Sequence, residues 1–245
     1  MPRPESVAAY AAMLAAARAD ANVAAVIVTG SHGAGVFDTP ASDIDLRIVT
    51  FEPDDRWMTA HGDPVESWAM TLEAFRSHGL RGTSTAWDRP TFLHVRVDVD
   101  RTDGLIAGSI EAKARLAPDE ARDVASAALD DYLNSVVRSL RNLEAGRELE
   151  GRLDGLETIA PLLTAVFAFE GRVRPYNKWL RHELSIRPSN DWDPIPTVDG
   201  LAADPRPDRQ RAALRVMERL ARAAGHGDVV DGWGPELPWL RGEGG

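Results

Sequence analysis

A short apolar run, a glycine-serine turn and two aspartates follow one another within residues 26–49, and this stretch constrains the fold most. The run before Gly30 is too short for a buried helix and is typical of a strand. A second strand is entered through Asp43 and Asp45. Side chains two residues apart on a strand point to the same face. That face can therefore hold a divalent metal.

A third acidic strand is predicted at residues 91–100, where apolar and polar side chains alternate. Asp98 and Asp100 both lie on the polar side of this alternation. We expect Asp98 to complete the carboxylate set because it lies deeper in the strand, with Asp100 as the alternative.

The second half of the chain has a different character. From Pro118 onward, apolar residues recur every three and four positions, which predicts long amphipathic helices. Residues 187–207 are rich in proline and are expected to form an ordered loop. We therefore predict an α+β protein in which a small mixed β-sheet domain flanked by helices (1–117) precedes a C-terminal helical bundle (118–245).

Glycines follow the first strand, but their spacing excludes two common nucleotide-binding motifs. A dinucleotide fingerprint starting at Gly33 would need glycine at the position of Asp38. No Gly-Lys-Ser/Thr follows for a P-loop. What remains is the Gly30-Ser31 turn, the two aspartates and the later acidic strand.

This combination resembles the nucleotidyltransferase superfamily of the polymerase-beta fold. Its members carry a Gly-Ser turn after the first strand, an Asp-x-Asp in the second and a further carboxylate on a later strand. The resemblance implies that Asp43, Asp45 and Asp98 bind Mg²⁺ and are catalytic. It also implies that Gly30 and Ser31 bind the phosphates of a nucleotide.

Elementary chemistry agrees with this resemblance. Nucleotidyl transfer from a triphosphate is served by two Mg²⁺ ions, roughly 3.5–4 Å apart, that stabilise the attacking and leaving oxygens. Magnesium takes oxygen ligands, which aspartates supply. A glycine lets the backbone approach a phosphate without a Cβ clash. We therefore expect Mg²⁺ as the cofactor.

The helical half is similar to the C-terminal domain of aminoglycoside-type nucleotidyltransferases, in which a helical lysine reaches the phosphates. Residues 172–187 carry five basic side chains and one acidic one, in a chain of net charge −10. Lys178 follows Arg174 by four residues, which is helical spacing. We expect these two to bind the triphosphate, with Glu170 or Asp100 as the general base.

Composition limits the partners. The charge of −10 argues against a broad nucleic-acid-binding surface. The sequence has no cysteine, and the alanine-rich run at residues 7–17 is expected to be a folded helix rather than a signal peptide. No run reaches the ~20 apolar residues that a membrane span needs. We expect a cytoplasmic protein without membrane contact.

The predicted activity is transfer of a nucleoside monophosphate, AMP by preference, from a triphosphate to a hydroxyl of a small acceptor. Antibiotics are among the candidate acceptors, and pyrophosphate is released. One alternative is a regulatory or antitoxin-like nucleotide-binding protein. Another is a transferase that modifies protein or RNA.

Overall fold

The computed structural model describes residues 3–35, 42–186 and 192–243. The chain divides into two compact units, Met1–Arg115 and Leu116–Gly245. The sequence had placed this boundary between residues 117 and 118.

The first unit contains a four-stranded sheet in the order β3-β2-β1-β4. Its strands are β1 (Val23–Thr29), β2 (Ile44–Thr50), β3 (Val65–Thr71) and β4 (Arg96–Asp100). β1 pairs antiparallel with both β2 and β4, whereas β2 pairs parallel with β3. The predicted mixed sheet is confirmed.

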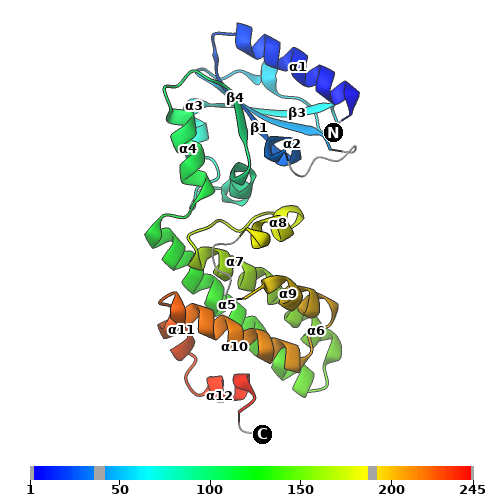
Figure 1. The fold of residues 1–245 in the computed structure, drawn as a ribbon, viewed down its shortest axis with the longest axis vertical. Helices are drawn as coiled ribbons and strands as arrows, with labels where there is room; N and C mark the ends of the chain where they lie inside the picture. The colour runs from blue at the N-terminus through cyan, green and yellow to red at the C-terminus, as the bar shows by residue number, and fades with distance from the viewer. Residues whose placement is uncertain (1–2, 36–41, 187–191, 244–245) are drawn as a thin grey trace. The chain divides into compact units, whose positions relative to one another are not determined.

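Each face of the sheet packs against a different apolar cluster, because strand side chains alternate. On one face Val26, Val28 and Leu46 are fully buried and pack with residues of α1 (Pro4–Ala19). Figure 1 shows α1 lying along the sheet. On the other face Ile27 packs in a second cluster.

Short helices complete this second face and the connections of the first unit. They are α2 (Gly30–Ala34), α3 (Leu72–Ser77), α4 (Leu105–Ala114) and the 3₁₀ segments η1 (Asp55–Trp57) and η2 (Ala86–Leu93). Phe75 of α3, Phe92 of η2 and Ile106 of α4 form the second cluster with β1 and β2. The strands are thus held between α1 and a layer of short helices.

The strand predicted at residues 91–100 is wrong in its first part. Thr91 to Leu93 belong to η2, and β4 begins at Arg96. Thr91 donates a hydrogen bond to Asp88 at 2.6 Å, which closes the 3₁₀ segment on itself. The pairing of β4 with β1 is also irregular, since Val26 faces Val99 but Ile27 faces Val97. Asp98 is the extra residue of this bulge.

The second unit is helical, as predicted, and the α+β class is confirmed. Its elements are α5 (Pro118–Glu144), α6 (Glu148–Glu157), α7 (Ile159–Phe169), η3 (Asn177–Trp179), α8 (Leu180–Ser185), α9 (Pro194–Ala203), α10 (Pro207–Ala223), α11 (Gly227–Asp231) and α12 (Glu236–Arg241). Figure 1 shows α5 as the long helix with α6, α7 and α10 beside it. Leu129, Val136 and Leu140 form the buried stripe of α5.

The loop predicted at 187–207 is wrong over α9. Residues 187–191 lie outside the described residues. Asp193 accepts a hydrogen bond from the Ile195 N–H at 2.9 Å and caps the helix, and Pro194 occupies its first turn. Proline is common in loops but is also favoured at the first position of a helix, and Pro194 occupies such a position here.

No helix in the described part of the chain combines the length and the apolar character needed to cross a bilayer.

Candidate metal centre

Three carboxylates converge at the start of β2 and β3. Asp43, Asp45 and Glu66 each offer an oxygen, and these oxygens lie within 4.8 Å of one another. Asp43 stands just before β2 and Asp45 is its second residue, so both side chains point to one face. The sequence predicted this pair; it did not single out Glu66.

The register between β2 and β3 brings Glu66 next to Asp43 and Asp45. β2 and β3 are parallel, and Asp45 lies directly opposite Glu66. Neighbouring strands are ~4.7–4.9 Å apart, so two side chains on the same face of paired residues meet. The only sequence signal was a carboxylate inside a strand-like segment, and its partner strand was not predictable.

Glu66 is held firmly and is buried. Its Oε1 accepts a hydrogen bond from the Gly62 N–H at 2.8 Å and lies 2.7 Å from Nδ1 of the exposed His61. The Gly62 N–H is the main cause that lowers the pKa of Glu66, and His61 adds to it. The hydrogen bond from His61 to Glu66 raises the pKa of His61 in turn. These contacts favour the ionised carboxylate of Glu66, which is the form that can bind a cation.

Gly30 packs directly against Asp45. It opens α2 with a φ of +66°, and a Cβ built on it would overlap Oδ2 of Asp45 and lie 3.2 Å from Cγ. Thr29 fixes the same region by donating a hydrogen bond from Oγ1 to the Asp45 carbonyl at 3.3 Å. The Gly-Ser turn and the Asp-x-Asp are therefore one local structure. Ser31 is the next residue of α2 and is half-buried.

The next pair along the two strands is Arg47 and Trp68, on the same face as the carboxylates. Arg47 is 7% exposed, donates a hydrogen bond to Asp88 at 3.0 Å, and its Cζ lies 4.3 Å from the Trp68 ring centroid. Asp88 also contacts His78 at 2.7 Å. Burial would raise the pKa of Asp88, but His78, Arg47 and a hydrogen bond from Thr91 outweigh it and leave that pKa lowered.

The donor set fits a hard divalent cation. Three carboxylates repel one another at this spacing unless a cation neutralises them. Oxygen ligands without nitrogen or sulfur are the set that Mg²⁺ and Ca²⁺ prefer. The absence of a side chain at Gly30 leaves the backbone close to Asp45. Asp43, Asp45 and Glu66 are thus the residues that can hold a metal.

Asp98 does not belong to this group of carboxylates. It accepts hydrogen bonds from the Tyr10 hydroxyl of α1 and from Arg96 Nε at 2.8 Å. Its side chain therefore lies on the α1 face, whereas Asp45 lies on the other face, since its neighbour Leu46 is the residue that packs against α1. The bulge in β4 contributes to this placement.

Asp100 has a local structural role. Its Oδ1 accepts hydrogen bonds from the Thr102 N–H at 2.8 Å and from the Thr102 hydroxyl at 2.6 Å. These bonds shape the turn that leads from β4 into α4.

The residues predicted in the helical half lie around the end of α7. Glu170 follows α7, and its Oε2 lies 3.6 Å from Nη1 of Arg172, which also pairs with Glu183. Arg174 donates to Asn177 Oδ1 at 3.0 Å and to the Ala160 carbonyl at 3.4 Å. Burial lowers the pKa of Arg174.

Lys178 lies in η3, and its Nζ is 5.2 Å from the Trp179 ring centroid. The side chain is exposed and forms no ion pair within the described residues. The helical spacing of Arg174 and Lys178 does not place them on the side of one helix, because η3 begins only at Asn177. The residue before it, Tyr176, is extended.

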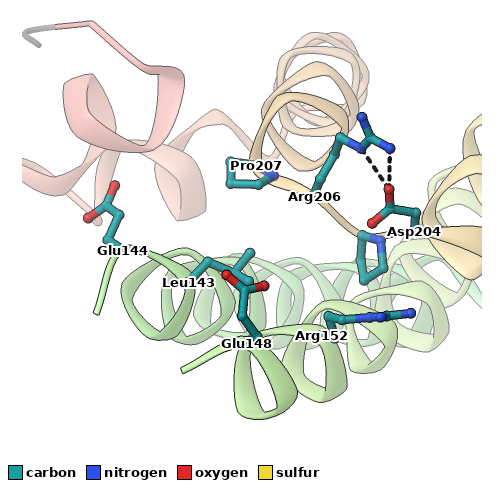
Figure 2. Close-up of a pocket in the computed structure, with 8 residues that line it drawn as sticks. Leu143, Glu144, Glu148, Arg152, Asp204, Arg206 and Pro207 are labelled. Atoms are coloured by element: carbon teal, nitrogen blue, oxygen red, sulfur yellow. Dashed lines mark hydrogen bonds and ion pairs between the residues drawn. The ribbon is translucent and has the colours of Figure 1, made fainter. Parts of the chain in front are cut away.

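The second unit also contains a cavity of about 320 Å³ (Figure 2). α5 and α6 contribute Leu143, Glu144, Glu148 and Arg152, and the start of α10 contributes Pro207. Arg206 Nε donates to Asp204 at 2.7 Å at its rim, as the dashed lines in Figure 2 show. The residues that line this cavity include none of the predicted site residues.

No protein-family model matches the sequence, and no curated protein matches it. Among solved structures, similarity is found to a nucleotidyltransferase-like protein from Exiguobacterium sibiricum 255-15. The sequence identity is 14%, the TM-score is 0.46, and the match covers 92% of this chain and 77% of the other. Function is therefore inferred from the site residues.

Proposed function

We propose that the protein is a metal-dependent nucleotidyltransferase that moves a nucleoside monophosphate from a triphosphate to an acceptor hydroxyl. The observation that carries the proposal is the convergence of Asp43, Asp45 and Glu66 beside Gly30. A glycine-serine turn packed on a carboxylate cluster can bring the phosphates of a nucleotide and a divalent cation to one place.

In this proposal Asp43, Asp45 and Glu66 hold Mg²⁺. When bound, Mg²⁺ stabilises negative charge on the oxygens of the reacting phosphate. Glu66 takes the position for which the sequence had suggested Asp98. Its support is the register of β2 and β3, while Asp98 is engaged by Tyr10 and Arg96.

The phosphates are assigned to the turn and to the basic residues. The first N–H groups of a helix have no partner inside it, so those of Gly30 and Ser31 are available to phosphate oxygens. Lys178 and Arg174 are proposed to neutralise the β- and γ-phosphates, and Lys178 is free of ion pairs among the described residues. Cation-phosphate hydrogen bonds are stronger than neutral ones.

The proposed reaction is an in-line displacement. The acceptor oxygen forms a bond to the α-phosphorus, and the bond from that phosphorus to the bridging oxygen of the β-phosphate breaks. The proton of the hydroxyl passes to a general base, for which we propose Glu170, and pyrophosphate leaves. We propose ATP as the donor and a small hydroxylated molecule, such as an antibiotic, as the acceptor.

The test is transfer of label from α-³²P nucleoside triphosphates in the presence of Mg²⁺. Small hydroxylated compounds, protein and tRNA serve as candidate acceptors, and Asp45→Asn is the control. We expect labelled product and pyrophosphate from the wild type and none from the variant. Nucleotide binding that is the same in both proteins, with no transfer to any acceptor, would refute the enzymatic proposal and favour a regulatory nucleotide-binding protein.

A further inference from the structure

An exposed tryptophan lies beside the carboxylate cluster. Trp68 follows Glu66 by two residues on β3, so both side chains emerge on the same face of the sheet. Two residues of a strand span about 6.6 Å. Trp68 nevertheless keeps 39% of its surface exposed, although large aromatic side chains are usually buried. Neither the metal site nor the proposed chemistry uses this ring.

Arg47 supports one face of the ring. The guanidinium of Arg47 lies over it, with Cζ 4.3 Å from the ring centroid, and Arg47 is itself 7% exposed. The face that the buried Arg47 covers is therefore closed to a ligand. A cation over one face of an indole holds the ring in place, and the ion pair with Asp88 holds the cation.

The Arg47 guanidinium contacts both the Trp68 ring and Asp88. One of its nitrogens donates to Asp88, whereas Nε and Nη1 are buried and have no hydrogen-bond partner. Such unsatisfied donors are costly in a protein interior. Buried donors without a partner call for an explanation.

We propose that the outward face of the Trp68 indole binds the nucleobase of the nucleoside triphosphate. This inference rests on the proposed function. The carboxylates and the metal would hold the α-phosphate, and one ribose separates that phosphate from the base. A planar ring two residues along the strand from Glu66 lies where the base can reach it. A saturated hydroxylated acceptor has no planar ring to stack, so the donor is the partner that this surface fits.

The experiment compares two ligands that differ in having a base. A nonhydrolysable ATP analogue and inorganic tripolyphosphate are each titrated with Mg²⁺ into the wild type, Trp68→Ala and Trp68→Phe. Stacking of a base on an aromatic side chain predicts about 5- to 150-fold weaker binding of the analogue to Trp68→Ala. We expect Trp68→Phe to recover most of this loss, and tripolyphosphate to bind all three proteins equally.

Phe51→Ala is the matched control. Phe51 is 45% exposed and follows the far end of β2, six residues from Asp45, or about 20 Å along the strand. Its removal should not change the affinity for the analogue.

Two results would overturn the inference. One is unchanged affinity of Trp68→Ala for the analogue, and the other is an equal loss for the analogue and tripolyphosphate. If the wild type catalyses transfer and Asp45→Asn does not, either result removes the stacking site and leaves the proposed function intact. Failure of the wild type to bind any nucleotide would remove both.

Discussion

Gly30 and Asp45 lie so close together that the glycine has no room for a side chain. A Cβ on Gly30 would overlap Oδ2 of Asp45, and the backbone there is left-handed, with a φ of +66°. The turn after β1 and the aspartate of β2 are therefore mutually dependent. The carboxylate occupies the space that any other residue at position 30 would need.

Gly30→Ala is predicted to abolish metal-dependent nucleotide binding by displacing the Asp45 carboxylate. The control is Gly35→Ala, because Gly35 has a φ of +68° but nothing within 4 Å of its Cβ position. Both variants pay a left-handed backbone cost of about 1–2 kcal/mol. Calorimetric titration of Mg²⁺ and an ATP analogue should show loss of binding in Gly30→Ala alone. Equal binding by the two variants would contradict the structural link between Gly30 and Asp45.

Glu66→Gln is predicted to lower transfer activity more than about 100-fold, since loss of a residue that merely orients a ligand already costs about 10–100-fold. Asp98→Asn is expected to keep most activity, because Asp98 is engaged by Tyr10 and Arg96 on the other face of the sheet. Transfer activity measured as a function of Mg²⁺ concentration distinguishes the two variants. A large loss in Asp98→Asn with wild-type behaviour of Glu66→Gln would restore the assignment suggested by the sequence.

The Asp43-Asp45 pair was predictable from the sequence because it depends on local geometry alone. Strand side chains alternate between the two faces of a sheet, so residues two apart share a face whatever the position of the strand in the sheet. Glu66 depends instead on which strand pairs with β2, in which direction and in which register. The sequence of residues 65–71 does not specify these choices, so Glu66 was not among the residues predicted to join Asp43 and Asp45.

The long helices were predictable for a similar reason. The stripe on α5 repeats over many turns and identifies a buried face without knowledge of its partners. Short elements behaved differently. In the proline-rich region that contains α9, and at the start of residues 91–100, the sequence pattern does not distinguish a regular element from a loop or one element type from another. Local hydrogen bonds to Asp193 and Asp88 stabilise the helical structure that forms there.

Lys178→Ala is predicted to raise the KM for the triphosphate by about tenfold or more, as expected for loss of a hydrogen bond between charged groups. The control is Arg181→Ala, which removes a nearby cation that is exposed and paired with Asp199 at 2.9 Å. Steady-state kinetics should show a normal KM in the control. Similar KM values for both variants would remove Lys178 from the phosphate site.

Asp88→Asn is predicted to destabilise the protein by about 3–5 kcal/mol at neutral pH, because it leaves the buried Arg47 without its counter-charge. Glu5→Gln is the control, since the Arg3-Glu5 pair is exposed and such pairs contribute about 0–1 kcal/mol. Unfolding in urea, followed at several pH values, measures both differences.

The pH dependence of the Asp88 contribution has a definite sign. The folded protein lowers the pKa of Asp88 below its unfolded value of about 3.9. The unfolded chain therefore takes up the proton first as the pH falls, and the stabilisation is complete above pH 4 and is lost as the pH drops through the folded pKa. The difference in unfolding free energy between wild type and Asp88→Asn should thus shrink as the pH falls below 4. A difference that grows as the pH falls below 4 would show that Asp88 is protonated in the folded protein, and the Arg47-Asp88 ion pair would then not be the contact that supports Trp68.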